Sequence, residues 1–315
     1  MIEVRDLVKR YRKAEVNAVD SISFAVSPGE FFVLLGPNGA GKTTTISILT
    51  TTLSPSSGAV RIAGHDIVQD SSAVRRNVGI IFQKPSLDQN LTAEENVRFH
   101  ALLYGLYPWR PSYRLMPRDY RERVNELAEV LGIQKEMFKP IKTFSGGMKR
   151  KLEIVRSLIH RPRVLFLDEP TTGLDPEARR GLWEYLGEMR KRSGTTTFLT
   201  THYLEEAEDA DTVCVLNKGR IVSYGTPAAV KSDLVEDYLV FDAEDRAALA
   251  LELQQLAISS VPFEGGQTKV PLHPGRTAHQ ILRSIHTPLT VIQTHTPTLE
   301  DAYLEILGRE AGATE

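Results

Sequence analysis

A glycine-rich loop between a buried strand and a helix is the feature that most constrains the fold of this chain. The loop reads GPNGAGKT at residues 36–43, directly after the apolar run FFVLLG, and a helix is expected over residues 41–53. Glycines let main-chain N–H groups surround a triphosphate, and the helix N-terminus adds positive potential. In this pattern Lys42 reaches the β- and γ-phosphates, and the Thr43 hydroxyl binds Mg²⁺. A glycine-rich turn with a surface lysine is the alternative, but the flanking strand and helix favour a nucleotide site.

A second segment that carries chemistry is RVLFLDE at residues 163–169, an apolar strand that ends in two carboxylates. In phosphoryl transfer the first, Asp168, holds Mg²⁺, usually through water, and the second, Glu169, positions and activates the attacking water. Two acids after a strand are often only solvated residues. Their presence in a chain with a phosphate-binding loop favours the catalytic interpretation.

The composition is that of an ordinary globular protein of one large domain or two modest ones, with 315 residues, 41% of them apolar, 38 basic and 40 acidic. No apolar run approaches the roughly 18 residues that a membrane span needs, and the charged N-terminus is unlike a signal peptide. We therefore expect a cytoplasmic chain unless a partner holds it at a membrane. Cys214 is the single cysteine and lies in an apolar stretch, which favours a core residue and permits no internal disulfide. The net charge of −2 gives no case for binding nucleic acid.

The order of strands and helices predicts an α/β fold. The segments IEVRDLVKRY and DSISFAVSP alternate like antiparallel strands, GAVRIAGHDI reads as a hairpin, and NVGIIFQ reads as a further buried strand. A capping box of Thr92 and Glu95 opens a helix that runs to about Leu103, and helical spacing returns over 119–131 and 147–160. Buried strands that alternate with helices indicate a mostly parallel sheet covered on both faces.

The character of the sequence changes near Lys231. Beyond it we expect helices at 244–256 and 276–286, strands near 259–272 and in LTVIQTH, and a last helix in TLEDAYLEILGRE. The sequence therefore predicts two domains, a large one over residues 1–230 and a small C-terminal α+β domain over residues 231–315.

A second glycine loop, FSGGMKRK at residues 144–151, precedes another helix but has no Gly-Lys-Thr of its own. Its Ser145, Gly146 and Gly147 offer a hydroxyl and free main-chain N–H groups to an anion. A chain with one complete phosphate-binding loop would not need this second loop to bind nucleotide alone.

Together, these segments make the chain similar to the ATP-binding subunit of an ABC transporter. The resemblance covers residues 1 to about 230 and implies a P-loop NTPase fold, the ABC ATPase domain, with a parallel sheet core, an antiparallel β subdomain and a helical subdomain. It rests on six motifs in order: the loop at 36–43, Gln83 after its strand, the signature from Ser145, the acidic strand at 163–169, Gly173-Leu174-Asp175-Pro176, and His202 after its strand.

The resemblance also implies roles for single residues. Glu169 is the general base, His202 contacts the γ-phosphate, and Gln83 senses a transmembrane partner and joins Thr43 and Asp168 around Mg²⁺. The residues expected to bind ATP are Tyr11, stacked on adenine, Gly36, Asn38, Gly39, Ala40, Gly41, Lys42, Thr43 and Thr44, with Ser145, Gly146 and Gly147 acting in trans.

Four of these residues have a plainer alternative. A lone polar residue at a strand end, such as Gln83 or His202, is more often a turn or capping residue, and a tyrosine on an edge strand, such as Tyr11, commonly packs against its neighbours. Asp175 would otherwise be a simple N-cap before a proline at the first helical position. The resemblance instead places Asp175 in a loop between two active sites.

The incomplete second loop has an explanation within this family. The resemblance implies that residues 145–147 of one copy bind the γ-phosphate held by Lys42 of another, so that two copies form a head-to-tail pair around ATP and Mg²⁺. It further implies a separate transmembrane permease, a peripheral position at the cytoplasmic face of the membrane, and no nucleic-acid partner. Phe144 and Met148 replace the usual Leu and Gln of the signature, as in the branch that exports drugs, antibiotics, lipids and polysaccharides, and the C-terminal extension resembles that of the drug-resistance ATPases.

Residues 105–118, GLYPWRPSYRLMPR, interrupt the helical pattern with three prolines, three arginines and an aromatic cluster. We expect a loop here, longer than is usual for the family. The loop is either a solvated surface segment or a contact to the permease or to anionic lipid headgroups, and the residues that would make this contact are Trp109, Arg110, Tyr113, Arg114 and Arg118.

Two other functions are compatible with a phosphate-binding loop. A soluble ABC-type ATPase that acts on ribosomes or DNA commonly fuses two ATPase halves or inserts long coiled coils, and the sequence has neither a second P-loop nor a sustained heptad pattern. A metabolic P-loop kinase would leave Ser145, Gly146 and Gly147 unexplained. The sequence therefore favours a transport ATPase.

Overall fold

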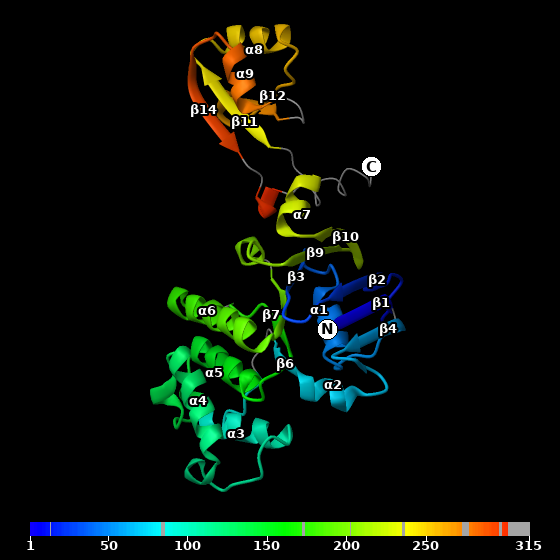
Figure 1. The fold of residues 1–315 in the computed structure, drawn as a ribbon, viewed down its shortest axis with the longest axis vertical. Coiled ribbons are helices and arrows are strands. Elements are labelled where there is room, and N and C mark those ends of the chain that lie inside the picture. The colour runs from blue at the N-terminus through cyan, green and yellow to red at the C-terminus, as the bar shows by residue number, and fades with distance from the viewer. Residues whose placement is uncertain are drawn as a thin grey trace. The chain divides into compact units, whose positions relative to one another are not determined.

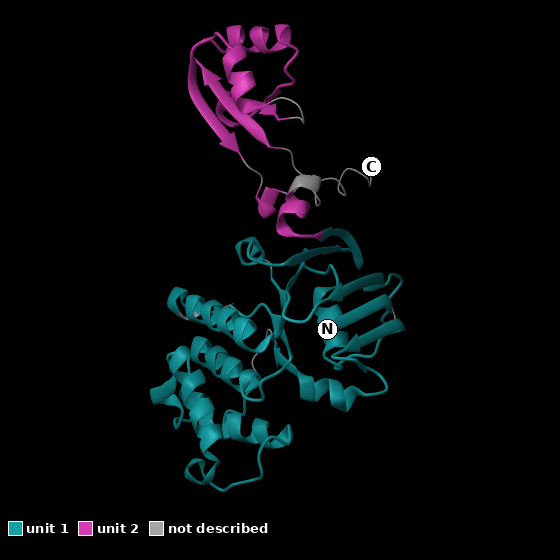
Figure 2. Ribbon diagram, viewed as in Figure 1, with its two compact units in different colours: residues 1–224 teal, residues 225–315 magenta. Residues whose placement is uncertain are grey.

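The computed structural model describes residues 1–12, 14–82, 86–171, 174–201, 203–234, 237–272, 277–295 and 298–301. The chain divides into two compact units, residues 1–224 and 225–315, which Figure 2 shows in teal and magenta. The sequence analysis placed the domain boundary between residues 230 and 231. This position lies inside helix α7 (Pro227–Leu234) of the second unit.

The first sheet of unit 1 is antiparallel and has the strand order β2-β1-β4-β5. Its strands are β1 (Ile2–Lys9), β2 (Val19–Val26), β4 (Ser57–Ile62) and β5 (His65–Asp66). Side chains of β2 alternate between buried and more exposed positions, as expected for a sheet with one face on the core. The predicted antiparallel strands and the hairpin at 59–66 are confirmed.

The second sheet of unit 1 has six strands in the order β10-β9-β3-β8-β7-β6. They are β3 (Phe31–Leu35), β6 (Val78–Ile81), β7 (Val164–Asp168), β8 (Thr196–Thr200), β9 (Thr212–Asn217) and β10 (Arg220–Gly225). The pairs β6/β7, β7/β8, β8/β3 and β3/β9 are parallel, and every residue of β3, β7 and β8 is buried. The predicted parallel core is therefore confirmed.

Aromatic rings join the two sheets. The Phe32 ring on β3 lies 5.2 Å from the Phe24 ring on β2 and 4.9 Å from the Phe198 ring on β8, and the Phe166 ring on β7 lies 5.4 Å from that of Phe198. Stacked rings of this size remove much apolar area from water, so the core of unit 1 lies between its two sheets.

Most helices of unit 1 lie where the sequence predicted helices, whereas α2 was not predicted. They are α1 (Lys42–Leu49), α2 (Ser71–Asn77), α3 (Ala93–Leu103), α4 (Arg118–Val130), α5 (Gly146–Leu158) and α6 (Pro176–Ser193). Single 3-10 turns occur at Tyr113–Leu115, Gln134–Glu136, Ile141–Thr143 and Leu204–Ala207 (η1 to η4). Figure 1 shows α3, α4 and α5 gathered as one helical group.

Two local predictions can be compared with the helix ends. Thr92 and Glu95 form both hydrogen bonds of the capping box that opens α3. The helix predicted at 41–53 ends at Leu49, because the chain turns at Thr51, whose φ of 60° is incompatible with a right-handed helix.

Unit 2 contains a four-stranded sheet in the order β12-β13-β11-β14. Its strands are β11 (Tyr238–Ala243), β12 (Val261–Pro262), β13 (Thr268–Pro271) and β14 (Leu289–His295), and its further helices are α8 (Arg246–Gln255) and α9 (Ala278–Ser284), with a 3-10 turn η5 (Glu264–Gly266). Leu239, Phe241, Leu253 and Val270 form the centre of its own apolar core. The last predicted helix lies mostly outside the described residues.

Glu252 on α8 holds the chain that leads into β14. Its carboxylate accepts hydrogen bonds from the Thr287 hydroxyl at 2.5 Å, from the Thr287 N–H at 2.9 Å and from the His286 N–H at 2.6 Å. These donors, with the Thr287 hydroxyl foremost, stabilise the charged form and lower the pKa of Glu252 to about 2.

The Glu252 contacts predict an acid-sensitive unit 2. Since the folded pKa lies below the ordinary value of 4.5, the contribution of Glu252 is complete above that value and is lost as the pH falls toward 2. We expect Glu252→Gln to remove this part of the acid dependence of unfolding, measured by thermal denaturation from neutral pH downward. Glu244→Gln, at an exposed acid of the same unit, is the control. Equal acid sensitivity of wild type and Glu252→Gln would contradict the assignment.

Candidate functional site

The loop at residues 36–41 joins the end of β3 to the start of α1. A Cβ atom on Gly36 would lie 2.2 Å from the carbonyl oxygen of Leu216, and one on Gly41 would lie 2.4 Å from that of Ala18. No side chain can occupy either place without moving the main chain. The glycines therefore let the loop pack against its neighbours, while Asn38 and Gly39 are exposed at its tip.

Lys42 lies almost buried under this loop, with 8% of its surface exposed. Its ammonium donates hydrogen bonds to the carbonyl oxygens of Gly36 at 2.6 Å and Pro37 at 3.0 Å. Burial lowers the pKa of Lys42, and the negative charges of Glu169 and Asp168 oppose that shift. The predicted phosphate-binding lysine and the two predicted acids therefore lie within one electrostatic neighbourhood.

The first turn of α1 is open to an anion. Its N-cap, Gly41, has a φ of 106° and no side-chain hydrogen bond caps the helix. The Thr43 side chain is exposed, and the Thr44 hydroxyl lies 3.2 Å from the hydroxyl of Tyr11, which is 47% exposed. Uncapped N–H groups and a hydroxyl at a helix N-terminus fit a phosphate group, and Tyr11 lies beside them.

Asp168 ends β7 beside Thr200, which ends β8. The Thr200 hydroxyl donates a hydrogen bond of 2.5 Å to the Asp168 carboxylate. Burial raises the pKa of Asp168, the bond from Thr200 opposes this, and the neighbouring charge of Glu169 adds to the rise. A cation bound at this carboxylate would relieve the cost of its burial.

The main chain of Glu169 is held in an uncommon conformation. Its φ of 48° lies in the left-handed region, which costs a non-glycine residue about 1–3 kcal/mol. Its N–H donates to the Thr200 carbonyl oxygen at 3.0 Å, and its own carbonyl oxygen accepts from Arg150 at 2.8 Å. Both bonds oppose relaxation of this turn, and they fix the point from which the Glu169 side chain leaves the sheet.

Arg150 on α5 is a residue that the sequence reasoning missed. It is 3% exposed, and its guanidinium donates to the carbonyl oxygens of Asp168 at 3.0 Å, Glu169 at 2.8 Å and Pro170 at 3.0 Å, and to that of Phe82. One side chain therefore binds four carbonyl oxygens around the acidic turn. A signal was present, because Arg150 shares the i, i+3, i+4, i+7 face of α5 with Glu153, Ile154 and Ser157, all of which are buried.

Glu153 and Arg156 extend this contact along α5. Glu153 pairs with Arg150 at 3.3 Å and accepts the Ser86 N–H at 2.7 Å, while Arg156 donates to the Ser86 carbonyl oxygen at 2.6 Å. Phe82 and Ser86 border the segment that contains Gln83. Gln83 itself lies outside the described residues, but both of its described borders are bound by α5.

The predicted signature residues lie at the N-terminus of this same helix. Ser145 is the N-cap of α5, and its hydroxyl accepts the Met148 N–H at 3.2 Å. Ser145 and Gly146 are exposed, whereas Phe144 is 5% exposed and anchors the turn. The N-terminus of a 13-residue helix is therefore presented to solvent, where the sequence predicted an anion-binding surface.

Asp175 immediately precedes α6, as the N-cap interpretation requires, and its carboxylate also lies 3.3 Å from the ammonium of Lys151 on α5. The loop before α6 is thereby joined to the signature helix. Gly173 and His202 lie outside the described residues.

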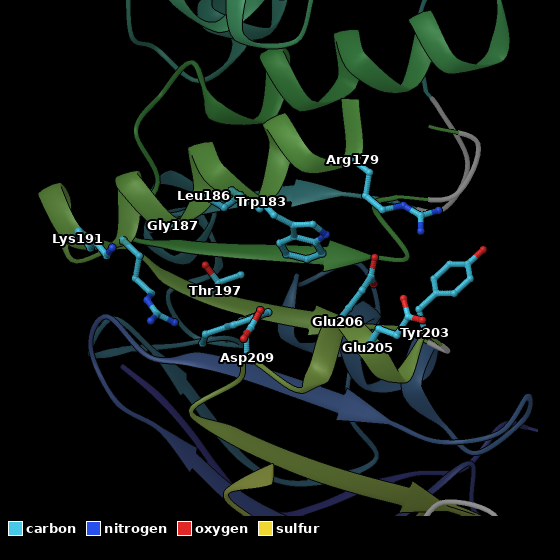
Figure 3. Close-up of a pocket in the computed structure, with 12 residues that line it drawn as sticks. Arg179, Trp183, Leu186, Gly187, Lys191, Thr197, Tyr203, Glu205, Glu206 and Asp209 are labelled. Atoms are coloured by element: carbon cyan, nitrogen blue, oxygen red, sulfur yellow. The ribbon is translucent and has the colours of Figure 1, made fainter. Parts of the chain in front are cut away.

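Glu206 is a second residue that sequence reasoning missed. Its carboxylate accepts hydrogen bonds of 2.7 Å from the hydroxyls of Thr171 and Thr201, both fully buried. Thr171 follows the acidic turn, and Thr201 precedes His202. Glu206 also lines a cavity of about 520 Å³ between α6 and η4, where Figure 3 shows it below Trp183 and near Tyr203. The sequence LEEAED resembles a solvated acidic face, so only the tertiary contacts reveal this role.

Comparison with known proteins identifies the family. The family model described as "ABC transporter" matches residues 19–172. The chain is 36% identical over 317 residues to the Nod factor export ATP-binding protein I of Paraburkholderia xenovorans, covering 98% of this chain and 97% of that protein. It is 40% identical over 250 residues to the daunorubicin/doxorubicin resistance ATP-binding protein DrrA of Streptomyces peucetius, covering 78% of this chain and 72% of that protein.

Solved structures agree with this result. An ATP-binding subunit of an ABC transporter has a TM-score of 0.66 at 31% identity, with 74% of this chain and 92% of that chain covered. The ATP-binding cassette MJ0796, solved as a dimer in a post-hydrolysis state with ADP and Pi, has a TM-score of 0.65 at 25% identity, with 72% and 98% covered.

The chain belongs to the family of ABC transporter ATP-binding subunits. The P-loop NTPase fold and the predicted activity, ATP hydrolysis coupled to transport in the export branch, are confirmed. The alternative of an ATPase acting on ribosomes or DNA has no support in these relatives.

Arg150 gives a direct test of the site geometry. We expect Arg150→Lys to lower kcat about tenfold to a hundredfold, because lysine cannot bind four carbonyl oxygens and the acidic turn would shift. The KM for ATP should change much less, since the loop at 36–41 is untouched. Steady-state ATPase assays measure both values, with urea unfolding to confirm that the variant is folded.

Arg156→Lys is the matched control for this variant. It replaces a half-buried arginine of the same helix with the same Glu153 partner, but the described hydrogen bonds of Arg156 go to Ser86 and Glu153 and not to residues 168–170. An equal loss of kcat in both variants would mean that Arg150 acts only through the packing of α5.

Proposed function

We propose that this protein hydrolyses ATP with Mg²⁺ as a head-to-tail dimer of itself and so drives a separately encoded permease that exports a drug, antibiotic, lipid or other hydrophobic compound. The observation that carries the proposal is the proximity of the Lys42 ammonium to the Asp168 and Glu169 carboxylates at the carboxyl ends of the parallel strands. The three charges are close enough to influence the pKa values of Lys42 and Asp168. Metal-assisted phosphoryl transfer requires a lysine ammonium that binds phosphates next to carboxylates that can bind the metal ion and activate water.

The residues of this chain suit Mg²⁺ held jointly with ATP. The described residues contain no cluster of three or more His, Cys, Asp or Glu side chains that could hold a metal ion. Mg²⁺ is commonly held by one or two protein oxygens together with substrate phosphates and water, and Thr43 and Asp168 would supply such oxygens, with Gln83 as the third predicted contact. When bound, Mg²⁺ would neutralise charge on the β- and γ-phosphates.

Each protein group has a proposed task in hydrolysis. Lys42 and the N–H groups of the loop bind the phosphates, and the Tyr11 ring stacks on adenine. Glu169 accepts a proton from the attacking water, and Arg150 keeps its turn in place. His202 contacts the γ-phosphate.

The exposed N-terminus of α5 supports the dimer. Ser145, Gly146 and Gly147 would complete the phosphate site of a second copy, because their helix presents positive potential to solvent. The MJ0796 cassette was solved as a dimer, which supports the association of two copies.

The relatives and the signature support export through a separate membrane protein. Both named relatives are ATP-binding proteins of resistance or export systems, and Phe144 and Met148 follow the signature of that branch. No helix in the described part of the chain is long and apolar enough to cross a bilayer. From the names of these relatives, the proposed location is peripheral, at the cytoplasmic face of the membrane, through the permease.

Replacement of the proposed base should separate binding from hydrolysis. We expect Glu169→Gln to lower kcat about 10²–10⁴-fold while ATP still binds, because the carboxylate that accepts the proton is lost and the phosphates stay bound. The variant should then accumulate as an ATP-bound dimer, measured by light scattering after size-exclusion chromatography. A monomer under saturating ATP would contradict the dimer proposal.

Loss of Lys42 should impair nucleotide binding, the step that precedes hydrolysis. We expect Lys42→Ala to weaken nucleotide affinity about tenfold or more and to abolish turnover, because a charge-assisted contact to the phosphates is removed. Titration with a fluorescent ATP analogue measures affinity, and phosphate release measures turnover. Wild-type values for both would remove Lys42 from the site. Lys135→Ala, at an exposed lysine of η2, is the control for a lost lysine charge.

A further inference from the structure

The connection between α3 and α4, residues 104–117, is an ordered segment at one end of the helical group of unit 1 (Figure 1). Tyrosine side chains hold it from within. The Tyr107 hydroxyl donates to Asp119 at 3.0 Å, and its ring meets that of Tyr120 edge-on at 5.4 Å. The Tyr113 hydroxyl donates to the Arg121 carbonyl oxygen and to Asn125, both at 3.2 Å.

Further contacts fix the main chain of this connection. Tyr120 is fully buried and Met116 is 4% exposed, so both form part of the core beneath the loop. Arg98 on α3 donates to the carbonyl oxygen of Arg110 at 2.7 Å. The connection therefore has its own small core, which a merely solvated loop would not need.

Large apolar side chains of this connection and of Leu103, the last residue of α3, face solvent. Leu103 is 84% exposed, Trp109 60% and Leu115 58%. Each exposed apolar group forgoes the stabilisation of burial, and three in about a dozen residues is more than a solvated loop requires.

The charges of the same segment are all positive. Residues 103–118 contain three arginines and no aspartate or glutamate. Arg110, Arg114 and Arg118 are all exposed, and Arg118 also pairs with Glu122 on α4 at 2.6 Å. Of the five residues that the sequence singled out, Trp109 and the three arginines therefore face outward, Arg118 with its charge partly compensated by Glu122, and Tyr113 is an internal anchor.

We propose that this surface, formed by Leu103, Trp109, Arg110, Arg114 and Leu115, binds the anionic headgroup region of a lipid bilayer. Tryptophan and leucine beside arginine are the residues that settle at this boundary, since the indole and the aliphatic groups enter the interface while guanidinium groups meet phosphates.

Two features favour a lipid surface over a protein partner. The hollow beside Trp109 measures only about 10 Å³, too small to receive a partner side chain as a protein interface core would. The excess of positive charge matches an anionic membrane, which needs no fixed shape complement. This surface contains none of the residues of the proposed nucleotide site. A failed lipid proposal would therefore leave ATP hydrolysis unchanged, and a failed ATPase mechanism would leave vesicle binding unchanged.

The test uses the fluorescence of the two tryptophans, Trp109 and Trp183. In Trp183→Phe, Trp109 is the only indole. We expect its emission to shift to shorter wavelength on mixing with vesicles of phosphatidylcholine and phosphatidylglycerol, to be quenched by lipids brominated near the headgroup end of the chains, and to revert at high salt. Vesicles of phosphatidylcholine alone should produce much less shift.

Charge variants make the test specific. Arg110→Ala/Arg114→Ala should lower partitioning of the whole chain onto anionic vesicles about 25-fold, at about fivefold for each arginine near the surface. Arg5→Ala/Arg192→Ala removes two exposed arginines elsewhere, paired with Glu3 and Glu188, and should have little effect. Cosedimentation of the double variants in the otherwise native chain gives the same comparison if Trp183→Phe does not fold.

Three results would overturn the proposal. The first is an unchanged Trp109 emission with anionic vesicles in a folded, ATP-hydrolysing Trp183→Phe protein, and the second is equal partitioning of the two double arginine variants. The third is a Trp109 shift that needs the permease and occurs in detergent without bilayer lipid. The last result would make the surface a protein-docking site.

Discussion

The buried guanidinium of Arg150 is the interaction on which the rest of the site depends. It holds the carbonyl oxygens of residues 168, 169 and 170, at the end of the acidic strand, to the helix that begins with the signature serine. A buried charge is stable only when its hydrogen bonds are satisfied, and here the donors stabilise a left-handed turn that would otherwise relax. Hydrogen bonds of Arg150 therefore join the acidic turn, the helix that begins after Ser145 and the flank of the Gln83 segment.

The same hydrogen bonds and ion pairs connect the proposed phosphate site to other parts of unit 1. Lys42 lies in the field of Asp168 and Glu169, so a bound phosphate would alter the charge balance at the acidic turn that Arg150 holds. Through α5 the same turn is joined to Ser86, and through Lys151 to the loop before α6. Glu206 adds a separate connection between Thr171 and Thr201. Displacement of one of these groups would strain the hydrogen bonds of its neighbours.

Much of this was predictable because it is encoded locally. The glycine loop, the apolar strands and the capping box at Thr92 depend on residues close together in sequence, and periodicity identified the helices to within a few residues. The misjudged features have non-local causes. The helix from Lys42 ends early because Thr51 turns the chain, and Tyr113 points inward because Phe138 and Asn125, distant in sequence, receive it. The sequence reasoning gave Arg150 and Glu206 no role, because their partners lie on other elements.

The sequence by itself determined the fold class, the phosphate-binding loop, the two acids and the membership of a family, since motif order and spacing are properties of the linear chain. Only the tertiary structure decided which charged residues are buried, how Glu169 is held at a positive φ, and which side of the 104–117 connection faces solvent. The physical reason is that desolvation and hydrogen bonding depend on neighbours supplied by distant segments. A run such as MKRK looks uniformly solvated until folding places its one arginine against four carbonyl oxygens.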